Sequence, residues 1–361
     1  MSGIGIIGAG KTGRGFIGRL MAEAGLRFVM VDKNEDLVNL LNVFGAYYEV
    51  EFFGGKREPV TVRDFDAFTW ETVGNALSDC ELIFVSVGGT NLADVGAELK
   101  ARLNDGKIHR VITCENASKP SERLRDAIGL SNVLVSEATV FCTTIEADGV
   151  NISSEDYPYL QFDAELLDAG CNPPAASLKP IVGFGNFLTR KLYTYNAASC
   201  VIAYMGWLYG YTDYGEAAND ERIVQLLHKN YDATNRVLCR VYGYDPADQA
   251  EFAALSEKKF RDRTIVDTIA RNAREPQRKM AAGERVIGPL TLLFEHGEDT
   301  SVLAMTAAAM LHYDNDGEDA WREMKAKQSP EELLASVGGL APDSALTRQI
   351  LTYYHEFGKV R

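Results

Sequence analysis

A glycine-rich segment near the N-terminus sets the tightest limit on how this chain can fold. Residues 3–8 are short, apolar and prone to form a strand, and they run directly into Gly8-Ala-Gly10-Lys-Thr-Gly13, which a helical pattern follows. Glycines at this spacing allow a tight turn at Gly8, close approach of a pyrophosphate to Gly10, and close packing of helix on strand at Gly13. The segment therefore predicts a dinucleotide-binding turn, with the phosphates at the N-terminus of the helix.

An acidic residue stands where such a unit would need one. The strand predicted over 26–32 ends at Asp32, about twenty residues after the glycines, where a carboxylate can accept hydrogen bonds from the adenosine ribose and repel a 2′-phosphate. The predicted cofactor is therefore NAD, although Lys33 leaves NADP open. A helix that begins with Asn34 as its N-cap is expected next.

Three further strands are expected over 80–89, 110–116 and 132–140, alternating with helices. This alternation predicts a doubly wound, mostly parallel sheet, which binds ligands at the carboxyl ends of its strands. Asn116 follows one such strand and could hold the nicotinamide, hold a substrate hydroxyl, or be an ordinary turn residue. The predicted cofactor contacts are Gly8, Gly10, Lys11, Thr12, Gly13, Arg14, Asp32, Val87, Gly88, Glu115 and Asn116.

The second half of the chain is helical from about residue 187. Because 361 residues exceed one typical core, we expect two domains: an α/β Rossmann domain over 1–186 and an all-α domain over 187–361. A strand pair or edge element is expected within 157–167. The proline-containing stretch 171–180 is the predicted linker.

Two groups of polar residues in the helical half are candidates for chemistry. On an ideal helix Asn196 and Ser199 lie roughly 140° and 80° around the axis from Lys191, within one broad arc. Farther along, four cations fall within twelve residues and could bind a phosphate or a carboxylate. They are Arg274, Arg278, Lys279 and Arg285. Both groups could also be no more than solvated helix faces.

Composition excludes several other classes of protein. A formal charge of −14 argues against a nucleic-acid partner. The six cysteines are scattered and the five histidines show no metal-ligand spacing, so we expect no metal site and no disulfides. The first strand leaves no room for a signal peptide, and no apolar run approaches the length of a membrane span. We therefore expect a soluble cytoplasmic protein.

Five motifs together resemble the mannitol dehydrogenase family of zinc-independent polyol dehydrogenases, over nearly the whole chain. They are GAGKTGRGFIG (8–18), CEN (114–116), RKLYTYN (190–196), PQRKMAAGERVIGPL (276–290) and AAAMLHY (307–313). The resemblance implies a Rossmann domain followed by a helical domain, and NAD-linked oxidation of a secondary alcohol of a sugar alcohol or sugar phosphate. It also implies Lys191 as general base and Asn196 as the amide that steadies the developing alkoxide. Ser199 and Asn116 complete the expected catalytic set.

Two departures from the family pattern concern the substrate. The family's K-x-x-x-x-N-x-x-H pattern ends here in Ser199, and residues 136–144 lack the Asp and Arg of the family's Asp-Arg-Ile run. We therefore expect a working dehydrogenase, a monomer or homodimer, with altered specificity. Two alternatives stay open: a dehydrogenase or epimerase of another sugar derivative with the same fold, and a protein that binds NAD without turnover.

Overall fold

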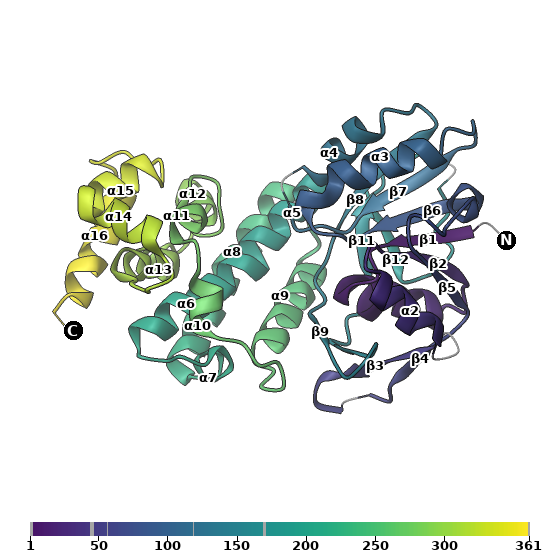
Figure 1. Cartoon of the computed structure of the whole chain (residues 1–361). Helices are drawn as coiled ribbons and strands as arrows, with labels where there is room; N and C mark the ends of the chain where they lie inside the picture. The colour runs from purple at the N-terminus through teal and green to yellow at the C-terminus, as the bar shows by residue number, and fades with distance from the viewer. Residues whose placement is uncertain (1–2, 44–46, 56, 118, 169–170, 360–361) are drawn as a thin grey trace. The chain divides into compact units, whose positions relative to one another are not determined.

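The computed structural model describes residues 3–43, 47–55, 57–117, 119–168 and 171–359. The chain forms two compact units, Met1–Gly185 and Asn186–Arg361 (Figure 1). The division lies one residue before the boundary expected from the sequence. The linker predicted over 171–180 is also corrected. Leu178–Ile181 forms a strand, β12, that pairs with β11 at the edge of the main sheet.

The N-terminal unit is built on an eight-stranded sheet in the order β12-β11-β8-β7-β6-β1-β2-β5. The strands besides β12 are β1 (Gly3–Ile7), β2 (Phe28–Val31), β5 (Phe65–Phe68), β6 (Cys80–Val85), β7 (His109–Thr113), β8 (Val133–Thr139) and β11 (Leu160–Asp163). The six strands from β5 to β8 pair in parallel, and β11 joins β8 antiparallel. The order of these six strands is that of a dinucleotide-binding fold, whose strand order reverses between β1 and β6. The predicted fold class is confirmed.

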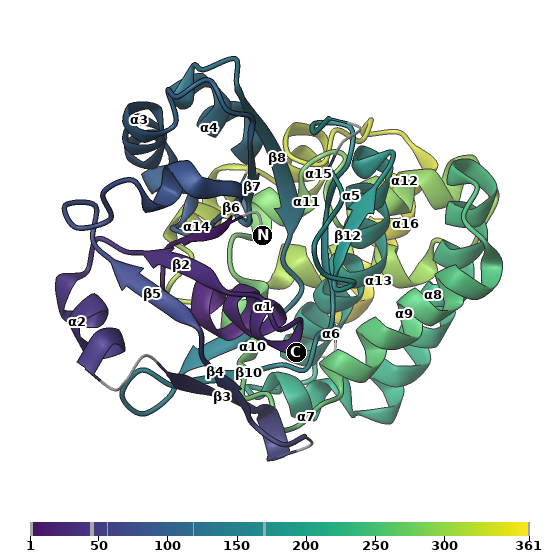
Figure 2. The same ribbon diagram turned by 90° about the vertical axis from the view of Figure 1, so that its right-hand side faces the viewer.

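Helices cover both faces of this sheet, so its central strands are apolar on both sides. Ile6 and Phe84 pack on one face with the first helical segments, η1 (Gly13–Gly18) and α1 (Arg19–Glu23), and with α2 (Glu35–Val43). Ile7 and Ile83 pack on the other face, with α3 (Leu92–Arg102) and α4 (Pro120–Ile128). Figure 2 shows α3 and α4 together on one side of the sheet and α1 on the other.

A second, four-stranded sheet was not expected from the sequence. Its order is β4-β3-β10-β9. Its strands are β3 (Tyr48–Phe52), β4 (Val60–Val62), β9 (Thr144–Glu146) and β10 (Ile152–Ser154). The parallel pair of β3 and β10 joins segments far apart in the chain, which no local sequence pattern reveals.

The C-terminal unit is helical, as expected. After α5 (Phe184–Lys191) the helices are η5 (Leu192–Asn196), α6 (Ala197–Leu208), α7 (Tyr214–Ala218), α8 (Glu221–Tyr242), α9 (Pro246–Phe260), α10 (Ile269–Ala273), α11 (Pro276–Met280), α12 (Ile287–Glu295), α13 (Ser301–His312), α14 (Asp319–Lys327), α15 (Pro330–Ser336) and α16 (Ala345–Phe357). The Ala-rich helices α6 and α13 lie in the middle of its core, where small side chains allow close approach. No helix in the described ranges combines the length and the apolar character needed to cross a membrane.

The N-cap expected at Asn34 is confirmed, because its side chain accepts a hydrogen bond from the Leu37 N–H at the start of α2. Ser329 and Glu332 form a reciprocal capping box at the start of α15. Within the half that was expected to be helical, α11 and α12 are separate helices rather than one continuous helix. The connection between them includes Gly283, whose φ of 78° requires the left-handed conformation that glycine favours.

Candidate active site

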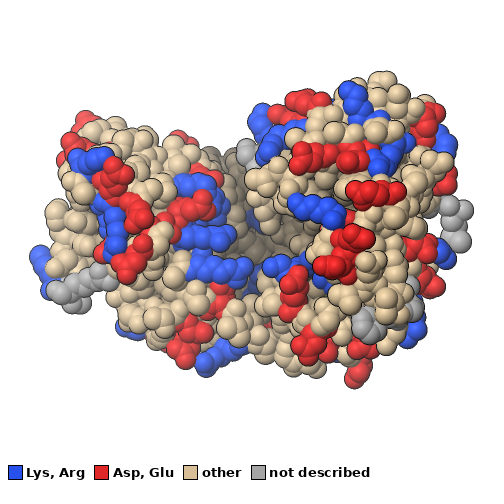
Figure 3. Space-filling model, viewed as in Figure 1, with Lys and Arg blue, Asp and Glu red and all other residues tan. Residues whose placement is uncertain are grey.

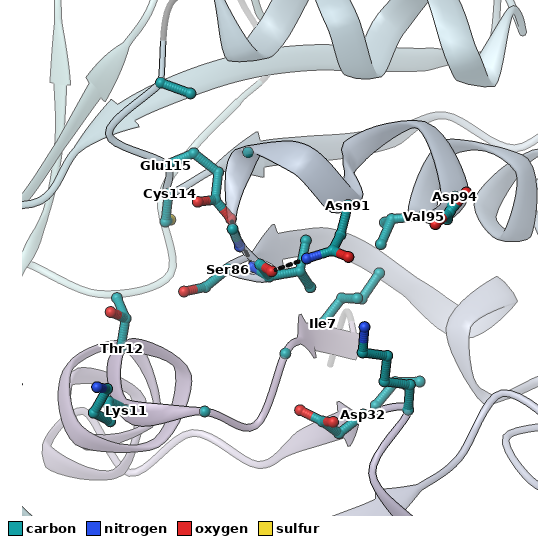
Figure 4. Close-up of a pocket in the computed structure, with 18 of the residues that line it drawn as sticks. Ile7, Lys11, Thr12, Asp32, Ser86, Asn91, Asp94, Val95, Cys114 and Glu115 are labelled. Atoms are coloured by element: carbon teal, nitrogen blue, oxygen red, sulfur yellow. Dashed lines mark hydrogen bonds between the residues drawn. The ribbon is translucent and has the colours of Figure 1, made fainter. Parts of the chain in front are cut away.

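A cavity of about 670 Å³ opens at the carboxyl ends of the parallel strands in the N-terminal unit. Side chains from the ends of β2 and β7 and from the glycine-rich turn surround the same space, among them Asp32, Glu115 and Thr12 (Figure 4). Of the predicted cofactor contacts, those that line this cavity are Gly8, Gly10, Lys11, Thr12, Asp32, Val87, Gly88, Glu115 and Asn116. The volume is typical of a small-molecule or cofactor site.

The three glycines play the separate parts that their spacing predicts. Gly8 has a φ of 94°, and a side chain there would collide with the backbone oxygen of Ser86. A side chain at Gly13 would collide with the Gly8 carbonyl oxygen, so this glycine lets the helix pack on the strand. At Gly10 a Cβ would meet no atom within 4 Å, which leaves room for a ligand to approach the backbone. These features fit the pyrophosphate of a dinucleotide.

Asp32 faces this turn from the end of β2. One carboxylate oxygen accepts a hydrogen bond from the Ala9 backbone N–H at 2.7 Å, and the other accepts from the Asn34 N–H at 2.9 Å. The carboxylate is therefore fixed beside the turn while still lining the cavity. This position suits recognition of the ribose hydroxyls of NAD.

Glu115 fixes the opposite wall of the cavity. Its Oε1 accepts hydrogen bonds from the backbone N–H groups of Val87 at 2.6 Å and Gly88 at 2.8 Å. Burial raises the pKa of this carboxyl, while the two N–H donors act in the opposite direction. Asn91 strengthens the same turn by donating to the Val87 carbonyl oxygen at 2.6 Å. Glu115 thus ties the loop after β6 to the end of β7.

Arg14, which was also predicted as a cofactor contact, does not line the cavity. Its side chain is buried, with 2% of the residue exposed, and its guanidinium donates to the backbone oxygens of Ala9 and Val150. Burial lowers the pKa of this guanidinium. Arg14 therefore joins the glycine-rich turn to the segment before β10. Gly13 also lies outside the cavity lining. This agrees with its predicted role, which is to let the helix pack closely on the strand.

Several lining residues were missed by sequence reasoning. Trp70 follows β5, a strand that was not predicted, and Asn91 and Asp94 lie at the start of α3. Their position beside the cavity depends on the strand order, which places β5 next to β2 and β6 next to β1. A correct assignment of β5 would have identified Trp70, because it follows that strand closely.

The second predicted site begins at Lys191, in the helical unit. Lys191 ends α5, and the next residues, Leu192–Asn196, form a π-helical turn before α6. A π turn has more residues per turn than an α-helix, so the even rotation used to place Asn196 and Ser199 around the axis does not hold across it. Such turns occur frequently at functional sites.

The surroundings of Lys191 lower the pKa of its amine toward neutral pH. Burial lowers its pKa to about 7, and the positive charges of Lys259 and Arg285 act in the same direction. An ordinary lysine has a pKa of about 10.4 and would be fully protonated at pH 7. Lys259 was not predicted from the sequence. It lies on α9, and only the packing of that helix brings its charge near Lys191.

The predicted cation cluster is electrostatically linked to this lysine. Burial lowers the pKa of Lys279 to about 8, and Arg285 acts on it as it does on Lys191. The Lys279 amine donates to the Asn272 carbonyl oxygen at 2.5 Å. The exposed Arg278 forms an ion pair with Glu275 at 2.8 Å. Figure 3 shows Lys and Arg side chains gathered on a surface of the helical unit.

The four cations differ in how available they are for a ligand. Arg274 is exposed, and its charge also acts on Lys279. Arg285 is half-buried and pairs with Glu284 at 3.2 Å. An exposed arginine in a carboxylate pair can exchange that partner for a phosphate at little cost. The cluster is therefore able to bind an anion, with Lys279 as its buried member.

Ser199, the residue that departs from the family pattern, contacts a buried tyrosine. The Tyr214 hydroxyl donates to the Ser199 Oγ at 3.1 Å. Burial raises the pKa of Tyr214 well above its ordinary value, so it stays a neutral donor. Because Ser199 accepts this bond, its own hydroxyl hydrogen points elsewhere. Asn196 ends the π turn and is half-buried.

Among the residues that the structure describes, no three or more His, Cys, Asp and Glu side chains come together as a metal-ligand group.

Comparison with known families identifies the architecture. The family described as "Mannitol dehydrogenase Rossmann domain" matches residues 3–145, and the one described as "Mannitol dehydrogenase C-terminal domain" matches residues 184–357. The chain belongs to the mannitol dehydrogenase family. The resemblance expected from the sequence is confirmed.

Individual relatives agree with this assignment, and solved structures share the fold. The chain is 29% identical over 346 residues to a mannitol-1-phosphate 5-dehydrogenase of Brevibacillus brevis, with 89% of each chain covered. It is 27% identical to the enzyme of the same name from an Exiguobacterium species, with 96% of each covered. A D-sorbitol dehydrogenase structure in substrate-free form superposes with a TM-score of 0.79 at 14% identity, covering 99% of this chain and 93% of the other. Mannitol 2-dehydrogenase from Pseudomonas fluorescens, solved with NAD and D-mannitol, gives 0.68 at 15% identity, covering 100% and 92%.

Proposed function

We propose that the protein is an NAD-dependent polyol dehydrogenase that interconverts mannitol 1-phosphate and fructose 6-phosphate, with Lys191 as its general base. The observation that carries this proposal is the place of Lys191, which matches the lysine of the family pattern and stands at the start of the π turn. Burial and the charges of Lys259 and Arg285 lower its pKa to about 7. A general base is most effective when its pKa lies near the working pH. The substrate names come from the curated relatives.

Each residue of the site has a distinct part in this reaction. NAD, when bound, supplies the acceptor for the hydride that leaves the carbinol carbon. Lys191 as the neutral amine takes the hydroxyl proton. Asn196, close after it on the π turn, donates an amide hydrogen to the developing alkoxide, an interaction that is strongest in the transition state. Asn116 lines the cavity at the end of β7 and is proposed to orient the nicotinamide end or a substrate hydroxyl.

The cation cluster supports a phosphorylated substrate. Arg278, Lys279 and Arg285 combine one exposed guanidinium, one buried amine and one half-buried guanidinium. Because Arg285 acts on both Lys191 and Lys279, an anion bound among these cations would lie near the catalytic lysine. We assign Arg274, Arg278, Lys279 and Arg285 to the phosphate.

A second candidate follows from Ser199. A serine held by Tyr214 can donate one hydrogen bond, but it cannot carry the charge of the histidine in the family pattern. Together with the missing Asp and Arg in residues 136–144, this favours a different sugar derivative as substrate. The reaction would then be a dehydrogenation, or an epimerisation that returns the hydride. Release of free NADH would argue against the epimerisation.

The experiment that tests the main proposal follows the absorbance of NADH with purified protein and fructose 6-phosphate, and separately with free fructose. Oxidation of NADH with the phosphorylated ketose is expected to fall by about 10²–10⁴-fold in Lys191→Ala, because the proton-transfer group is lost. Lys258→Ala, at an exposed position of α9, is the matched control and should retain full activity.

Three results of this assay would be informative. Turnover of fructose 6-phosphate with loss in the variant supports the proposal. Turnover of another sugar in a wider panel supports the second candidate. NADH binding without turnover of any sugar supports an NAD-binding protein without catalysis. The cytoplasmic location and the monomeric or dimeric state remain predictions from the sequence.

A further inference from the structure

A buried glutamine on α9 contacts both α5, which ends at Lys191, and the π turn that follows it. Gln249 is fully buried, with 0% of its surface exposed. Its Oε1 accepts a hydrogen bond from the Arg190 Nε at 2.7 Å, and its Nε2 donates to the Thr194 Oγ1 at 3.2 Å. The same Nε2 also donates to the Asn235 Oδ1, on α8, at 2.8 Å. Both ends of the amide are therefore paired.

The arginine next to Lys191 is fixed from all sides. The Arg190 guanidinium donates to the Asp248 carbonyl oxygen at 2.9 Å and pairs with the Asp248 carboxylate at 2.7 Å. It also lies over the rings of Tyr244, at 4.5 Å, and Phe252, at 4.2 Å. Cation–π contacts and charge-assisted hydrogen bonds are among the stronger interactions available to a buried guanidinium. The backbone immediately before Lys191 is thereby anchored to α9.

The second contact of Gln249 lies within the π turn itself. Thr194 is the middle residue of Leu192–Asn196 and is fully buried. Gln249 therefore connects the residue before Lys191 to the middle of the turn after it. A π turn is rare, and surrounding contacts must hold a rare backbone conformation in place. Here Gln249 supplies such contacts through its paired amide.

We propose that Gln249 is a positioning residue, which fixes the π turn and so holds Lys191 at the angle to Asn196 that the reaction requires. This inference rests on the proposed function of Lys191. The cost of misplacing a catalytic group explains why such a network would be retained, since a shift of about 1 Å can reduce the rate by about 10²-fold. A fully paired buried network also rigidifies the segments that it joins.

The test removes one hydrogen-bond partner and leaves the rest of the network. Thr194→Val has nearly the same shape as threonine but cannot accept from Gln249. Thr194→Ser keeps the hydroxyl and should behave as the wild type. Thr306→Val is the matched control, because Thr306 is also fully buried in a helix and its hydroxyl donates only to Val302, within α13.

Two measurements separate positioning from stability. In Thr194→Val the kcat is expected to fall by about tenfold or more, with the KM for NAD unchanged and Thr194→Ser active. The titration of Lys191 can be followed by NMR after reductive ¹³C-methylation, with the signal assigned by its loss in Lys191→Arg. Its midpoint should move upward in Thr194→Val, as the amine gains access to water. Lys259 from α9 and Arg285 from the connection before α12 are the charged groups that act on it.

The proposal is overturned if Thr194→Val matches Thr306→Val in kcat and in the Lys191 titration. If Thr194→Val does not fold, Asn235→Ala replaces it with the same expectation, because Asn235 is a half-buried member of the network. The titration requires no substrate. An absence of turnover in the wild type would therefore count against the proposed function alone, and the titration would still decide the role of Gln249.

Discussion

The Asp32 carboxylate accepts a hydrogen bond from the backbone N–H of Ala9 at 2.7 Å, which joins the end of β2 to the glycine-rich turn. One acidic side chain thus holds the phosphate-binding turn and lines the cavity where the adenosine ribose of a dinucleotide would lie. A substitution can separate these two roles, because only the discrimination at the adenosine ribose depends on the negative charge of Asp32.

Asp32→Asn should therefore change cofactor preference without loosening the turn. The amide oxygen can still accept from the Ala9 N–H that holds the turn, whereas the bond from the exposed Asn34 N–H is lost. The charge that repels a 2′-phosphate is gone. We expect the ratio of kcat/KM for NAD over NADP to fall by about tenfold, which corresponds to about 1.4 kcal/mol. Asp36→Asn, an exposed acid in the first turn of α2, is the control and should leave the ratio unchanged. Equal ratios in both variants would contradict this role of Asp32.

The glycines of the turn should separate binding from stability. Gly10→Ala adds a methyl group where no protein atom lies within 4 Å, so Tm should stay near the wild-type value while the Kd for NADH rises. Crowding of the pyrophosphate should cost about 1–3 kcal/mol of binding energy. Gly13→Ala forces a methyl group against the Gly8 carbonyl oxygen and should lower the free energy of unfolding by about 2 kcal/mol or more. NADH titration and thermal unfolding of both variants provide the check. The reverse pattern would show that the two glycines had been assigned the wrong roles.

Local sequence patterns predicted the part of the fold that depends on local backbone geometry. Gly8 was expected in a tight turn and has a positive φ, and Asn34 was expected as an N-cap and accepts the capping hydrogen bond. The parallel strands 80–89, 110–116 and 132–140 were also found, because buried strands read as apolar runs. The Rossmann sheet and its binding edge followed from these signals alone.

Long-range strand pairing and irregular helices could not be predicted from local sequence patterns. The pairing of β3 with β10 and the strand β5 before Trp70 depend on contacts between distant segments. The π turn at Leu192–Asn196 interrupts the helical period, but it contains no proline or glycine from which the interruption could be predicted. Gln249 reads as one polar residue among the acidic residues of α9, and only tertiary packing shows it between Arg190 and Thr194.

Lys259 should tune the pH dependence of the reaction. Its positive charge lowers the pKa of Lys191, so Lys259→Gln should raise that pKa and move the acidic limb of kcat/KM for alcohol oxidation to higher pH. The pKa should not return to its ordinary value, because burial is the larger cause and remains. Lys258→Gln, the exposed neighbour on the same helix, serves as control. Profiles of kcat/KM against pH that coincide for both variants would show that Lys259 does not act on Lys191.

Stability should depend on pH in a way that reveals the lowered pKa of Lys191. Lys191 has a pKa of about 7 in the folded chain and an ordinary value of about 10.4 when unfolded. Between these values the unfolded chain binds more protons, so the contribution of Lys191 to the free energy of unfolding rises with pH. Below pH 7 the ammonium is charged in both states, and its desolvation destabilises the fold in full.

Lys191→Met removes this penalty while keeping an unbranched apolar side chain. We expect the variant to unfold with a free energy about 1–3 kcal/mol above that of the wild type at pH 6.5. The difference should shrink steadily toward pH 10, where the wild-type amine is neutral in the folded state and increasingly so in the unfolded one. Urea unfolding of both proteins across this range measures the difference directly, and Lys258→Met controls for the loss of an exposed charge. A difference that stays constant with pH would mean that Lys191 keeps its ordinary pKa, and the general-base role would then lose its physical basis.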